Sequence, residues 1–170
     1  MRFFRKAFAG PVVAAVMAVA FVDLSHAEEL RSLEGTWVLD QAFEIHGDGS
    51  TGTLYGPHPK GLLSVDASGR YNLQIFKVYR PIFASGDKAH GTAEEYRAAV
   101  LGSSTHFGKV SIDTAHHQLI FDVEAASFPN WEGKQQVRDF TYQNGLLSYA
   151  VPPSVDGTTA YSVWRRPDGK

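Results

Sequence analysis

The sequence of 170 residues contains no cysteine, and this absence excludes several kinds of chemistry. Without a thiol the chain cannot form disulfides, use a thiolate nucleophile, or bind zinc through cysteine. Histidine does not replace cysteine as a metal ligand, because the adjacent His116 and His117 would point to opposite faces of a strand. Phosphate-binding and dinucleotide-binding glycine motifs are missing as well. We therefore expect neither a metal nor another cofactor.

The sequence also lacks a hydrophobic run long enough to span a bilayer. The apolar run from Ala7 to Val22 is shorter than the about 20 residues that a membrane-spanning helix needs. It follows basic residues at positions 2–6 and precedes Ser25-His26-Ala27, which is the pattern of a secretory signal peptide cut after Ala27. We expect residues 1–27 to be removed, and residues 28–170 to act in the periplasm or outside the cell without stable membrane insertion.

Clusters of positive charge are missing too. Removal of the signal peptide takes away three of 16 basic and one of 18 acidic residues, so the net charge changes from −2 to about −4. Nucleic acids and anionic membrane surfaces both attract proteins through a positive field. We therefore expect no nucleic-acid partner, and the sequence leaves the oligomeric state open.

Short strand-like runs, separated by glycine, proline, asparagine and aspartate, fill residues 28–170. The first carries Trp37, Leu39, Phe43 and Ile45 in rough alternation. Thr92 and Glu95 fit a capping box, which predicts a short helix to about Gly102 between the third and fourth strands. The predicted strands cover residues 35–46, 61–65, 70–79, 106–112, 118–126, 135–142, 146–151 and 158–166.

The number and order of these runs predict the fold class. About eight strands joined by hairpins, among them one with Asn144-Gly145 at its turn, are typical of an all-β antiparallel up-and-down barrel. Closing the barrel removes the exposed edges that an open sheet would leave. We predict one such domain over residues 28–170.

Several motifs resemble those of a known family. Gly35-Thr36-Trp37 and Trp164-Arg165-Arg166 resemble the lipocalin arrangement in which an early tryptophan closes the barrel floor and a late arginine stacks on it; we assign these roles to Trp37 and Arg165. A longer set of segments strengthens the likeness: Tyr55–Gly61, Asp66–Arg70, Phe83–Asp87, Glu124–Trp131, Gln136–Arg138 and Val163–Arg166. Together they resemble the lipocalin-like domain family, which implies a calycin-type barrel.

Glu124 and Arg138 are the candidate functional pair. They belong to strands that we predict to be neighbours, so they could face each other across the barrel interior. Arg138 would then hold a ligand carboxylate or enolate bidentately, and Glu124 would orient it. A structural ion pair, or two solvated residues on the outer face, explains the same residues.

The other candidates follow from strand parity and loop position. Gln136, Arg138, Phe140 and Tyr142 share one face of their strand and resemble a ligand wall, although an aromatic core explains the last two equally well. The loop Phe128–Trp131 and Tyr55 would lie near the barrel mouth. The predicted ligand-binding set is Tyr55, Gln74, Phe76, Glu124, Phe128, Asn130, Trp131, Arg138, Phe140 and Tyr142.

Three functional hypotheses remain at this point, of which the sequence favours the first. The barrel binds a small, largely apolar molecule that bears a carboxylate or carbonyl group. Alternatively, an enzyme isomerises, cyclises or hydrolyses such a molecule, with Glu124 as acid or base and Arg138 stabilising negative charge. In the third, a barrel filled by its own side chains binds proteins through an exposed apolar patch.

Overall fold

The computed structural model describes residues 31–167. The predicted signal peptide and its cut after Ala27 lie outside the described residues, so export stays a prediction, to be checked by the mass of the mature protein. Within residues 31–167 no helix is both long and apolar enough to cross a membrane.

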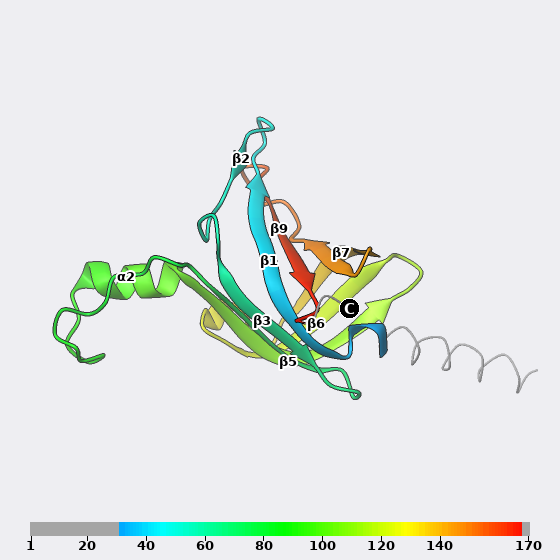
Figure 1. Ribbon diagram of the computed structural model, residues 1–170, viewed down its shortest axis with the longest axis horizontal. Helices are drawn as coiled ribbons and strands as arrows, with labels where there is room; N and C mark the ends of the chain where they lie inside the picture. Colours follow the sequence, from blue (N-terminus) through cyan, green and yellow to red (C-terminus); the bar gives the residue numbers. More distant parts are fainter. Residues whose placement is uncertain (1–30, 168–170) are drawn as a thin grey trace, which may run out of the picture.

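The strands form one antiparallel sheet that closes into a barrel (Figure 1). They are β1 (Gly35–Ile45), the two-residue β2 (Thr51–Gly52), β3 (Lys60–Val65), β4 (Arg70–Phe76), β5 (Ser103–Asp113), β6 (Gln118–Ala126), β7 (Gln135–Gln143), β8 (Leu146–Ala150) and β9 (Thr159–Arg165). Each long strand pairs with the next along the chain, and β1 also pairs with β9. The predicted eight-stranded up-and-down barrel is confirmed.

The predicted helix is also present. Helix α2 (Ala93–Leu101) has the expected capping box, in which Thr92 Oγ1 accepts from the Glu95 amide at 3.2 Å and Glu95 Oε2 accepts from the Thr92 amide at 2.7 Å. Figure 1 shows α2 projecting beyond the barrel wall, and none of its residues is buried. The predicted third strand was too long, because β4 ends at Phe76 rather than at Tyr79.

A β-bulge in β1 corrects the alternation expected for the first strand. The register between β1 and β9 shifts between Leu39 and Gln41, so Asp40 is an extra residue and the side chains after it change face. Ala42 is therefore buried, whereas Ile45 is exposed. This shift places Glu44 on the inner face of the barrel.

The end of the barrel near the start of β1 is filled by side chains. Trp37 and Trp164 are fully buried there. The Arg166 guanidinium carbon lies 3.7 Å from the centre of the Trp37 ring, and Arg166 Nη2 donates to the Ser32 carbonyl at 2.9 Å. The stacking role assigned to Arg165 is therefore wrong: its Nε faces Asp40 Oδ1 at 3.5 Å on the outer surface.

Candidate functional site

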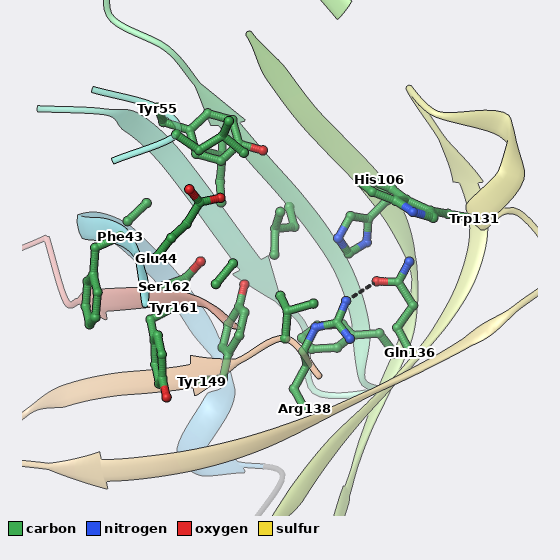
Figure 2. A pocket seen from close by; sticks show the side chains of 17 residues that line it. Phe43, Glu44, Tyr55, His106, Trp131, Gln136, Arg138, Tyr149, Tyr161 and Ser162 are labelled. Atoms are coloured by element: carbon green, nitrogen blue, oxygen red, sulfur yellow. Dashed lines mark hydrogen bonds between the residues drawn. The ribbon is translucent and has the colours of Figure 1, made fainter. Parts of the chain in front are cut away.

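The other half of the barrel encloses a cavity of about 210 Å³ (Figure 2). Strands β1, β4, β5, β6, β7, β8 and β9 all contribute residues to its wall. Most of the lining is aliphatic or aromatic. The lining residues are Ala42, Phe43, Glu44, Leu54, Tyr55, Leu73, Ile75, His106, Phe121, Trp131, Gln136, Arg138, Tyr149, Val151, Ala160, Tyr161 and Ser162.

Arg138 on β7 is the cation of this cavity. Its Nη1 donates to the Val137 carbonyl at 3.0 Å and its Nη2 donates to Gln136 Oε1 at 2.6 Å. These bonds use two of the five N–H donors of the guanidinium. Within residues 31–167 no carboxylate lies within ion-pair distance of it. Burial lowers the pKa of Arg138 from its ordinary value, and the nearby hydroxyls of Tyr149 and Tyr71 oppose this effect. The group stays charged at neutral pH.

His106 on β5 lies across from Arg138 as a neutral group. It is 8% exposed, and its Nδ1 is 2.7 Å from the Tyr71 hydroxyl. Burial, and to a lesser degree the charge of Arg138, lowers the pKa of His106 to about 4. At neutral pH the imidazole therefore has one N–H to donate and adds no charge to the cavity.

The short 3-10 helix η1 (Pro129–Trp131) positions one aromatic side chain over the cavity. The Trp131 ring packs edge-on against His106, with 5.9 Å between ring centres, and also against Phe128. Proline at the first helical position favours this turn. Of the three residues of the Phe128–Trp131 loop predicted to bind ligand, Trp131 reaches the cavity, whereas Phe128 and Asn130 are exposed.

Tyr55 and Glu44 lie on the side of the cavity away from Arg138 (Figure 2). Burial raises the pKa of the Tyr55 phenol, and the charge of Glu44 raises it further. Tyr55 was predicted from its loop position, but Glu44 was not. No signal in the alternation of β1 reveals Glu44, because the bulge at Asp40 reverses that alternation.

The comparison with protein families agrees with this architecture. The model of the lipocalin-like domain matches residues 34–166. The chain belongs to the lipocalin-like domain family. The comparison with curated proteins gave no match. A lipocalin-like barrel is consistent with the binding of a small molecule, and the cavity is where this barrel has room for one.

The lipocalin-like barrel does not bring Glu124 and Arg138 together, which corrects the pairing expected from the sequence. Glu124 lies on the outer face, where its two carboxylate oxygens accept from Arg70 Nη1 at 2.9 Å and Nη2 at 2.8 Å. The side chain faces outward because it alternates along β6 with the buried Phe121 and Val123. Catalysis with Glu124 as the acid or base inside the cavity is therefore excluded by its position.

The remaining predicted residues of the lipocalin-like barrel also lie off the cavity. On β4 the buried side chains are Tyr71, Leu73 and Ile75, so Gln74 and Phe76 face outward. Phe140 packs against the filled half of the barrel, and Tyr142 packs edge-on against Trp37 at 5.8 Å. Among the described residues no three histidine, aspartate or glutamate side chains gather as a metal site would require.

Proposed function

We propose that this lipocalin-like barrel binds a small, largely apolar organic anion, whose carboxylate contacts Arg138. One observation carries the proposal: a half-buried guanidinium faces a largely apolar cavity and has no carboxylate within ion-pair distance in residues 31–167. A cation removed from water without a counter-ion is unfavourable. A bound anion supplies the missing charge and hydrogen bonds.

The donors around Arg138 favour a carboxylate or a similar oxyanion. A guanidinium matches a carboxylate with two parallel hydrogen bonds. Because Gln136 Oε1 already accepts from Arg138, its amide nitrogen is left to donate to the same ligand. His106 lies on the same side of the cavity, and in the tautomer whose Nδ1 accepts from the Tyr71 hydroxyl its Nε2–H is left to donate to the ligand.

The size of the cavity limits the apolar part of the ligand. A protein cavity of about 150 Å³ binds benzene. The 210 Å³ found here therefore suits one ring, or an aliphatic chain of similar bulk, with a small polar substituent. Leu73, Ile75 and Phe121 provide the apolar surface against which this part would pack.

Titration calorimetry with 4-methylbenzoate tests the proposal. We expect measurable binding to the wild-type protein, and weaker binding of the neutral 4-methylbenzamide, because only the carboxylate pairs with Arg138. The variant Arg138→Met should weaken 4-methylbenzoate binding at least about tenfold, since a charged hydrogen bond contributes about 1.5–3 kcal/mol. Arg70→Met removes an arginine of the outer face and serves as the matched control.

Circular dichroism of each variant would establish that the barrel is intact. Binding of 4-methylbenzoate that is unchanged in Arg138→Met, or lost equally in Arg70→Met, would overturn the assignment of Arg138.

A further inference from the structure

Glu44 is a second charged group on the cavity wall, of opposite sign to Arg138. Figure 2 shows its carboxylate facing the cavity from β1, on the side away from Arg138. Among the described residues it has no ion-pair partner and no side-chain hydrogen bond. The two opposite charges therefore share one cavity without forming an ion pair.

The strand register shows how these two charges are spaced. Glu44 pairs with Ala160 on β9, and the Val151 amide donates to the Ala160 carbonyl at 2.8 Å. Arg138 precedes Asp139, which pairs with Ala150 on β8, so Arg138 lies opposite Val151. Four neighbouring strands therefore carry one row of inward side chains: the negatively charged Glu44, the apolar Ala160 and Val151, and the positively charged Arg138.

The spacing of this row leaves room for one molecule between the charges. At about 4.8 Å between neighbouring strands, three strand spacings place β1 and β7 roughly 14 Å apart along the wall. Both side chains reach inward from their strands (Figure 2), so the charged groups are closer together than this. The apolar side chains of Val151 and Ala160 line the cavity between them.

An aromatic ring lies beside the acidic end of the row. Tyr55 lines the cavity next to Glu44 (Figure 2), whereas the stacked rings of Phe43 and Tyr161 point to the outer face, because each alternates with inward-facing neighbours on its strand. A carboxylate beside an aromatic ring is a favourable environment for an ammonium group, through an ion pair and cation–π contact. The guanidinium at the other end favours a carboxylate.

We infer that the ligand is a zwitterion: an amino acid in which a ring or short chain separates the carboxylate from the ammonium group. Its carboxylate binds Arg138, its apolar spacer packs against Val151 and Ala160, and its ammonium group binds Glu44. This inference rests on the proposed function, because it requires the anion site at Arg138. An α-amino acid fits less well, since its two charges are adjacent and cannot reach both ends of the row.

Two probes that differ only in the ammonium group test the inference by calorimetry at pH 7. They are 4-methylbenzoate and 4-(aminomethyl)benzoate. We expect the wild-type protein to bind the zwitterion about tenfold more tightly, because a charged hydrogen bond is added. Glu44→Gln should abolish this preference, and it should strengthen rather than weaken 4-methylbenzoate binding, because it removes a negative charge from the same cavity. Glu124→Gln makes the same substitution on the outer face and should retain the preference.

The outcomes separate the two proposals. If 4-methylbenzoate binds in an Arg138-dependent manner, but the zwitterion binds no more tightly or its preference survives in Glu44→Gln, the zwitterion inference is wrong and the anion site stands. If neither probe binds at millimolar concentration, both proposals are wrong. Tighter binding of benzylamine than of either carboxylate would likewise overturn the anion site.

Discussion

At the scale of single residues, His106 makes the stability of the folded protein depend on pH. Its ring packs against Phe121 and Trp131, and the Tyr71 hydroxyl is its hydrogen-bond partner. These neighbours stabilise the neutral imidazole, and the positive charge of Arg138 disfavours the protonated form further. Protonation of His106 therefore opposes folding.

The pH dependence of stability follows from the pKa of His106, about 4 in the folded protein and 6.5 when unperturbed. Between these values the unfolded chain binds the additional proton, so stability falls as the pH drops from 6.5 towards 4. The full effect is on the order of 3 kcal/mol. We expect urea denaturation to show a smaller loss between pH 7 and pH 4.5 for His106→Gln than for wild type.

His58, which is exposed and makes no side-chain hydrogen bond or ion pair within residues 31–167, provides the control. His58→Gln should lose stability with pH as the wild type does, because the acid-sensitive carboxylates and their hydrogen bonds are common to all three proteins. An identical loss for His106→Gln and wild type would contradict the role of His106.

Residue identities in the sequence predicted part of the site. Arg138, Tyr55 and Trp131 were predicted because a cation and large aromatics on a barrel wall or mouth suit a ligand. Glu44 was missed because a single extra residue in a strand turns every later side chain to the opposite face, and no residue type marks a bulge. Glu124 was misplaced for a different reason: it alternates with the apolar Phe121 and Val123, which fill the interior, so the period of two on β6 places it outside.

At the scale of elements, the pairing of β5 with β6 depends on one glycine. Gly108 lies where their register shifts, and a Cβ there would overlap the Asp122 carbonyl of β6. The backbone of β6 cannot rotate away as a flexible side chain would, so a side chain at position 108 would force the whole strand to shift. This close approach fixes the register of β5 against β6.

The variant Gly108→Ala should therefore lower the free energy of unfolding by about 3 kcal/mol, the upper range for overpacking a tightly packed site. Ser111→Ala, on the exposed face of the same strand, should change it by less than about 0.5 kcal/mol. Urea denaturation of both variants makes the comparison. Equal stabilities would show that β6 accommodates a methyl group at this position.

The positions of the strands and the helix were easier to predict from the sequence than the direction, inward or outward, of their side chains. Turn residues end strands by backbone chemistry that acts locally, as at Asn144-Gly145, where both residues have positive φ. The capping box of α2 is local in the same way. The end of β4 was misplaced because Lys77 and Tyr79 are compatible with a strand, and the change of direction there depends on tertiary packing.

At the scale of the whole molecule, the barrel divides into a filled half and a hollow half. Trp37, Trp164 and Leu147 are fully buried in the filled half. The hollow half carries Arg138, Glu44 and the rings of Tyr55 and Tyr149. Substitutions at the filled end should therefore change stability without changing ligand binding, and the reverse should hold at the cavity.

Two adjacent arginines allow a direct test of this division. Arg166 stacks on Trp37 and donates to the Ser32 carbonyl, whereas Arg165 makes a long, exposed ion pair with Asp40. Arg166→Met should lower the free energy of unfolding by about 1–2 kcal/mol, because it removes a cation–π contact and a hydrogen bond. Arg165→Met should change it by less than about 0.5 kcal/mol, as exposed ion pairs contribute little. Both variants should bind 4-methylbenzoate as the wild type does. A larger destabilisation by Arg165→Met would show that the exposed arginine, rather than the stacked one, closes the barrel floor.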